Sequence, residues 1–102
     1  METQNLLQER EFDSRGYVSK LLHDSDGLRV ALFCLEPQQE VPPHVSPSEV
    51  VFYVIEGRGR VGLGADEGAV AVGALVACPS GIPHSLKADT RLVVLATIAA
   101  RP

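Results

Sequence analysis

From Gly16 onward, short apolar runs alternate with residues that favour turns, and this pattern predicts strands. Turn signals recur about every eight to twelve residues, a spacing typical of β-sandwiches and barrels. No segment has a convincing helical period, so we expect an all-β domain of about eight to ten short strands. The expected strands span residues 17–22, 28–35, 50–55, 60–63, 69–72, 75–78, 84–87 and 91–99.

Two of these runs, 50–55 and 92–98, are apolar at successive positions instead of alternating with polar residues. Successive side chains of a strand point to opposite faces, so both faces of these strands need a cover. One face belongs in the core, and the other requires a second layer, the N-terminal segment or another subunit. A domain of this size has few layers of its own, so a homodimer is expected. The alternative is a monomer whose own N-terminal arm covers the sheet.

Residues 1–15 form a polar, charged segment, and residues 16–102 are expected to form a single barrel domain. We expect this N-terminal arm to be partly ordered at best, or to dock on a neighbouring subunit. The arm lacks the apolar stretch of a signal peptide. The length of 102 residues is that of one domain.

The formal net charge is −4, and the basic residues are scattered. Nucleic acids and anionic membrane surfaces both require a basic patch, so neither is an expected partner. Apolar runs of about six residues are far too short to span a bilayer. Cys34 and Cys78 each lie in an apolar run, which favours buried reduced thiols and a cytoplasmic location.

Two histidines are the candidate site chemistry. His44 follows the rigid pair Pro42-Pro43, and His84 follows a turn that contains Pro79 and Pro83. Proline fixes the backbone beside each histidine, and an apolar run lies close to each. The third histidine, His23, falls in a predicted hairpin turn and is expected to be exposed.

The spacing of Gly73, Pro79, Gly81 and His84 resembles the second conserved motif of the cupins. The stretch from His44 to Gly57 is similar to the first cupin motif, which begins with histidine, any residue, histidine. The two motifs occur in the family's order, and the strand and turn pattern agrees over about residues 16–100. The resemblance implies a double-stranded β-helix, the cupin jelly-roll barrel.

Metal-binding cupins use two histidines and a glutamate of the first motif together with the histidine of the second. In this sequence Ser46 stands at the second histidine position and Val50 at the glutamate position. A β-bulge near Pro47 would be needed to turn Glu49 inward as a substitute. The resemblance therefore implies no certain cofactor, or a weakly held divalent metal such as zinc, iron, manganese or nickel.

We expect His44, Ser46 and His84, with Phe52 or Tyr53, to line a pocket at the barrel mouth. The leading prediction is a module that binds a small organic molecule. The alternative is a metal-dependent enzyme, similar to dioxygenase or isomerase cupins, with metal held by His44, His84 and Glu49. A pure interaction scaffold is a third hypothesis. Fold alone does not separate them, so whether a reaction is catalysed stays open.

Overall fold

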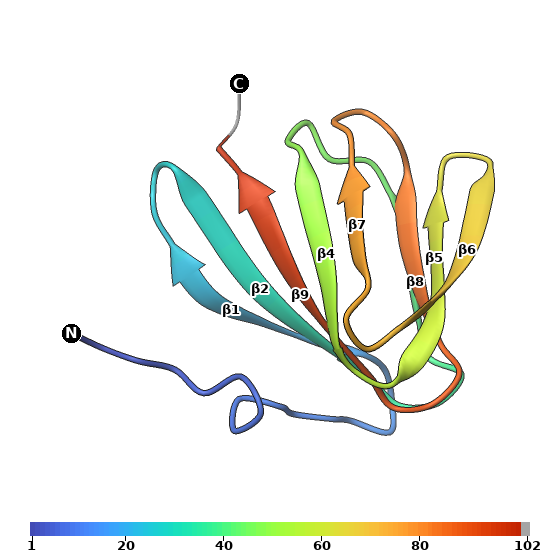
Figure 1. The fold of residues 1–102 in the computed structure, drawn as a ribbon, viewed down its shortest axis with the longest axis horizontal. Helices are drawn as coiled ribbons and strands as arrows, with labels where there is room; N and C mark the ends of the chain where they lie inside the picture. The colour runs from blue at the N-terminus through green and yellow to red at the C-terminus, as the bar shows by residue number, and fades with distance from the viewer. Residues whose placement is uncertain (101–102) are drawn as a thin grey trace.

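The computed structural model describes residues 1–100, and this part of the chain is built of strands without a helix (Figure 1). The strands are β1 Val18–Asp24, β2 Leu28–Leu35, β3 Glu40–His44, β4 Val50–Glu56, β5 Arg58–Leu63, β6 Asp66–Ala71, β7 Leu75–Cys78, β8 His84–Ala88 and β9 Leu92–Ala99. Consequently, no helix of residues 1–100 is long and apolar enough to cross a membrane.

The strands form two antiparallel sheets. One has the order β1-β2-β9-β4-β7 and the other the order β3-β8-β5-β6. In Figure 1 the first sheet fans from β1 at the left to β7, and β8, β5 and β6 follow at the right. Each sheet pairs strands from distant parts of the chain, as β2 with β9 and β3 with β8, as well as the consecutive strands β1 with β2 and β5 with β6. The predicted all-β jelly roll is confirmed.

The main core lies between the two sheets. Strands β4 and β9 bury alternate residues against the four-stranded sheet, which contributes Val61, Leu86 and Ala88. The register pairs Phe52 with Ala96 and Val54 with Val94, so these inward side chains sit in one layer. Burying such side chains is the main driving force for closing the barrel.

A second, smaller cluster lies on the outer face of the five-stranded sheet. Leu32, Cys34 and Val93 are fully buried there, and Phe12 of the N-terminal arm packs against the same cluster. The Arg91 guanidinium lies 4.2 Å from the centre of the Phe12 ring, a cation–π contact. The arm therefore covers part of this face, as it runs beneath the sheet in Figure 1.

Polar contacts also attach the arm to its own barrel. Arg10 forms an ion pair with Glu56, and Lys20 lies 3.1 Å from a Glu9 carboxylate oxygen. These contacts place the arm on its own barrel, as in the alternative in which the arm covers the sheet, and docking on a neighbouring subunit stays a prediction. Sequence reasoning counted the charges of the arm but did not see that Phe12 could anchor it.

Strand β3 was not among the predicted strands. It contains Pro42 and Pro43, which cannot donate backbone hydrogen bonds. It lies at the edge of its sheet, where one side needs no partner, and its pairing with β8 is irregular between Val41 and His44. Proline is tolerated in such edge strands, so the sequence signal for a loop was misleading.

Candidate functional site

His44 and His84 lie directly opposite each other on the antiparallel strands β3 and β8. Their imidazole rings are 4.8 Å apart between centres, with an angle of 56° between the ring planes. The sequence places these histidines forty positions apart, and the pairing of an edge strand with its neighbour brings them together. Their predicted convergence at one site agrees with this geometry.

The connections that carry the two motifs are also joined to each other. The backbone N–H of Gly81 donates a hydrogen bond of 2.9 Å to the carbonyl of Ser46. Gly81 has a φ of 79°, a conformation that glycine adopts without strain. The two connections lie at the same end of the barrel, at the top of Figure 1, and this link fixes one against the other.

A cavity of about 470 Å³ opens beside the two histidines. Its volume is within the range usual for small-molecule sites. Strands of both sheets contribute to its walls, which are apolar for the most part with a few polar groups. The lining residues are Tyr17, Ser19, Arg29, Phe33, Val41, His44, Val45, Ser46, Pro47, Val50, Phe52, His84, Ser85, Leu86, Ala96 and Ile98.

His84 forms the more enclosed part of the histidine pair. It is 7% exposed, and the edge of its ring meets Phe52 at a centre-to-centre distance of 5.5 Å. Burial lowers the pKa of His84, and positive charge on His44 lowers this pKa further. Hydrogen bonding to the Ile82 backbone carbonyl raises the pKa of His84, but this effect is smaller than the lowering by burial. The neutral imidazole is thus favoured near neutral pH.

The Nδ1 atom of His84 is buried and has no hydrogen-bond partner of normal geometry among residues 1–100. Buried polar atoms in native proteins nearly always have a partner, either in the protein or in a bound molecule. The Nδ1 atom itself is closed to the cavity, and the Ile82 backbone carbonyl is the protein group that acts on the ring. His44, by contrast, lies in the exposed part of the cavity wall.

Ser46 also lines the cavity and is 8% exposed. Its hydroxyl oxygen accepts a hydrogen bond of 3.1 Å from the backbone N–H of Ser48. This contact is a local turn of the kind that serine favours. The structure therefore places Ser46 in the cavity wall, where we expected it. Its hydroxyl also stabilises the turn between β3 and β4.

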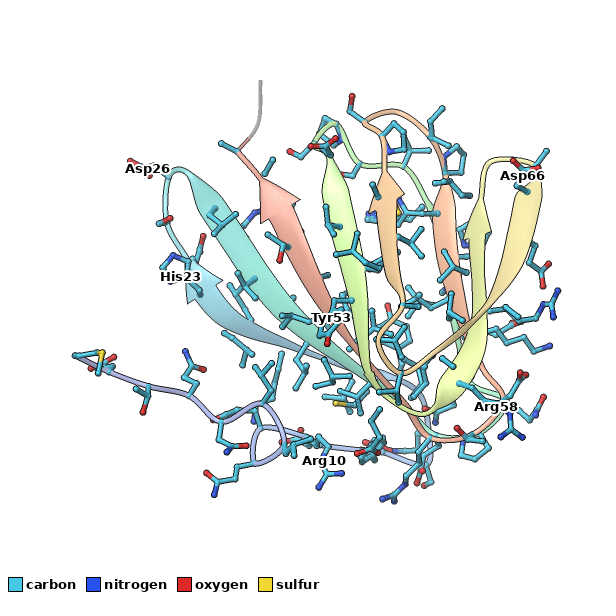
Figure 2. All side chains as sticks on the ribbon, viewed as in Figure 1. Arg10, His23, Asp26, Tyr53, Arg58 and Asp66 are labelled. Carbon is cyan, nitrogen blue, oxygen red and sulfur yellow. The ribbon has the colours of Figure 1, made fainter. Side chains whose placement is uncertain are left out.

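The structure separates the two predicted aromatic residues, Phe52 and Tyr53. Phe52 is buried and lines the cavity, whereas Tyr53 is 42% exposed on the opposite face of β4. Figure 2 shows Tyr53 in front of the five-stranded sheet. Neighbouring residues of one strand point to opposite faces, so only one of the two can face the cavity.

Glu49 is not part of the cavity wall, so the structure does not bring it together with His44 and His84 as a third ligand. Its side chain is exposed, and its carbonyl accepts a hydrogen bond of 3.0 Å from the backbone N–H of Ala99. That bond continues the regular pairing in which Val50 faces Ile98. The irregularity in this region falls within β3, before His44, so it leaves the orientation of Glu49 unchanged.

The cavity does not hold the donor set of a complete divalent-metal site. Within residues 1–100, no group of three His, Cys, Asp or Glu side chains is placed to bind one ion. His44 and His84 are two nitrogen donors, Ser46 offers a neutral hydroxyl, and Val50 offers none. Protein sites for zinc or non-haem iron generally supply three or four ligands. The residues present do not fit such a site.

Sequence reasoning missed several cavity residues, among them Tyr17, Ser19 and Arg29. Arg29 belongs to neither motif, and the residues that alternate with it in β2 are the more apolar set. The structure shows that the set with Arg29 and Phe33 faces the cavity. Alternation puts Arg29 on one face with Ala31 and Phe33, but it does not say that this face meets the cavity.

Comparison with known proteins places the fold in a family. The sequence model of the cupin domain matches residues 31–98, which is more than half of the chain. This protein belongs to the cupin family. Comparison with curated protein sequences gives no match.

Solved structures with similar folds include two small proteins of nearly the same length. The protein TT1209 from Thermus thermophilus is 27% identical with a TM-score of 0.93, and the alignment covers 100% of both chains. An RmlC-like cupin from Desulfovibrio desulfuricans is 32% identical with a TM-score of 0.90, covering 97% of this chain and 96% of the other.

A larger enzyme contains a similar domain. Salicylate 1,2-dioxygenase from Pseudoaminobacter salicylatoxidans, solved as adducts with gentisate, is 22% identical with a TM-score of 0.79. The alignment covers 84% of this chain but 25% of the enzyme. At this identity the likeness extends to the fold alone.

Proposed function

We propose that this protein binds a small organic molecule in the cavity beside His44 and His84. The observation that carries the proposal is a cavity of about 470 Å³ with apolar walls and a few convergent polar groups. The imidazole groups of His44 and His84 line this cavity and supply polar groups for the bound molecule. The incomplete metal donor set favours binding of an organic molecule over metal-dependent catalysis.

Nuclear magnetic resonance of the 15N-labelled protein with a library of small organic fragments tests this proposal. Binders should shift the amide signals of the cavity strands, and Phe52→Ala should change their affinity. A matched control is Val72→Ala, since Val72 is 65% exposed and lies outside the cavity lining. The proposal fails if no fragment shifts the cavity signals, or if the shifts gather elsewhere.

The metal content of the purified protein is a separate test. After incubation with zinc, iron, manganese or nickel and extensive dialysis, elemental analysis should find well below one equivalent of ion. Two protein ligands hold a metal much more weakly than three or four. About one tightly held equivalent would contradict the proposal.

A metal-dependent enzyme is the second candidate, because the two imidazoles lie close enough together to share an ion. The ion would then be held by His44 and His84, and its other ligands would have to be water or the substrate. In that case the double substitution of both histidines by alanine should abolish metal occupancy. Occupancy unchanged in the double variant would exclude this candidate.

We further propose that the protein acts in the cytoplasm. Cys34 and Cys78 are free and buried, so neither needs an oxidising compartment to form a disulfide. Burial raises the pKa of both thiols, which disfavours the reactive thiolate. Fractionation of the source cells should place the protein in the cytoplasmic fraction, and recovery outside that fraction would overturn this assignment.

A further inference from the structure

Arg29 is a half-buried cation in the wall of the cavity. Four arginines of residues 1–100 form ion pairs with carboxylates: Arg10, Arg15, Arg60 and Arg91. Arg29 and Arg58 form none with this part of the chain, and Arg58 is exposed. Among the described residues, Arg29 is thus the arginine that lines the cavity and has no ion pair there.

The cavity wall supplies no counter-charge for Arg29, and the two carboxylates closest to it along the chain and across the strand pair are exposed. The cavity lining contains no aspartate or glutamate. Asp24 lies opposite Arg29 in the β1–β2 pairing and Asp26 lies in the following turn, but both are exposed and neither forms an ion pair with it. A guanidinium that is partly removed from water without a counter-charge is unfavourable unless another group pairs with it.

The groups beside Arg29 would suit a ligand with an apolar body. Ile98 lies opposite it on β9, and the Phe33 ring further along β2 packs near the Tyr17 ring at 6.1 Å. Ser19 and Tyr17 add hydroxyl groups to the same wall. The histidine pair lies on the other sheet. The cavity therefore has a charged region at Arg29 on one sheet and a region with the neutral imidazole of His84 on the other.

We propose that the cavity binds small monocarboxylates and that Arg29 pairs with their carboxylate group. This proposal rests on the function proposed above and names its ligand class. A guanidinium matches a planar carboxylate with two parallel hydrogen bonds. Phosphate groups carry more charge and generally gather several cations or backbone N–H groups, whereas this lining contains one arginine and no lysine.

Matched pairs of acids and their amides test the proposal because members of a pair differ mainly in charge. The probes are benzoate with benzamide, phenylacetate with phenylacetamide, and hexanoate with hexanamide. Dissociation constants are measured by amide-shift titration at fixed ionic strength. The wild-type protein should bind at least one carboxylate about 10- to 100-fold more tightly than its amide, the range for a charge-assisted hydrogen bond.

Arg29→Gln should remove that preference, reducing carboxylate affinity by about 10- to 100-fold and leaving amide affinity unchanged. Arg29→Lys keeps the charge without the paired hydrogen bonds, so it should retain part of the preference and serves where the glutamine variant does not fold. Arg58→Gln removes an unpaired charge near the opposite end of the barrel (Figure 2) and should leave the preference intact.

Three results would overturn the proposal. Equal binding of acids and amides by the wild-type protein refutes the role of charge while leaving a small-molecule cavity in place. If Arg29→Gln still prefers carboxylates over amides, then a group other than Arg29 binds the carboxylate. Binding of neither member of any pair contradicts the monocarboxylate class, and the fragment screen then decides whether the cavity function fails as well.

Discussion

At the scale of single residues, His84 couples the site to the stability of the fold. Burial lowers its pKa in the folded protein, whereas an exposed histidine in the unfolded chain has a pKa of about 6.5. Between these two values the unfolded chain binds more protons than the folded protein. The contribution of His84 to stability is therefore complete above about pH 6.5 and is lost as the pH falls through the folded-state pKa.

We expect urea denaturation in metal-free buffer to show lower stability at about pH 5.5 than at about pH 7.5. His84→Gln should reduce this difference because it removes the titrating group. His23→Gln serves as the matched control, since His23 is exposed at the end of β1 (Figure 2), and it should leave the pH dependence intact. An equal pH dependence of stability in wild type and His84→Gln would show that His84 is not the group responsible.

Gly57 shows why the first motif ends in glycine. Its φ is 82°, and a Cβ added there would overlap the backbone carbonyl of Arg91. Gly57→Ala should therefore lower the free energy of unfolding by at least ~2 kcal/mol, because strain and overlap act together.

Chemical denaturation of Gly57→Ala beside Gly68→Ala measures that effect. Gly68 lies in β6 without a positive φ, and a Cβ there would meet no atom within 4 Å. The control should change stability by less than about 1 kcal/mol. Similar stabilities for the two variants would show that the tight turn at Gly57 can relax.

At the scale of strands, the sequence predicted those that consist of largely apolar runs bounded by turn residues. The predicted ranges 28–35 and 75–78 coincide with β2 and β7, and 50–55 falls one residue short of β4. Strand β3 escaped prediction because its prolines are tolerated only at an edge, and edge position is a property of the assembled sheet. The sequence did not predict which face of β2 meets the cavity, for a related reason.

In β2, the alternate residues Leu32 and Cys34 are the more buried, yet they face the arm and not the cavity. Local alternation separates two faces without saying which sheet each will meet. The spacing of the two motifs allowed His44 and His84 to be predicted as site residues. Arg29 could be assigned only once the pairing of β2 with β9 had placed it beside Ile98.

The packing of the N-terminal arm on its own barrel can be tested at Phe12. Phe12→Ala would expose part of the cluster around Leu32 and Val93 and would remove the cation–π contact with Arg91. Since Phe12 is only half-buried, we expect the free energy of unfolding to fall by about 2 kcal/mol, less than for the loss of a core phenylalanine. Thermal and urea unfolding should show this loss, with little change in Leu7→Ala, because Leu7 is 53% exposed. Equal stabilities would mean that the arm contributes no net stability.

At the scale of the whole molecule, the arm covers only part of the outer sheet face. Tyr53 and Leu75 pair across β4 and β7, and they are 42% and 66% exposed. Ala77, opposite Val51 on the same face, is exposed as well. An apolar sheet face of this kind is typical of an interface, and the expected homodimer stays a prediction for this part of the surface.

A second copy of the chain is the occupant we expect, because the same face of two subunits can meet about a two-fold axis. Light scattering coupled to gel filtration should find a dimer for the wild type and a monomer for Tyr53→Lys with Leu75→Lys, since buried unpaired lysines oppose association. Leu21→Lys alters a residue that is 58% exposed on β1, the opposite edge of the sheet, and should remain dimeric. A monomeric wild type, or a dimer that survives both lysines, would show that this face does not hold the subunits together.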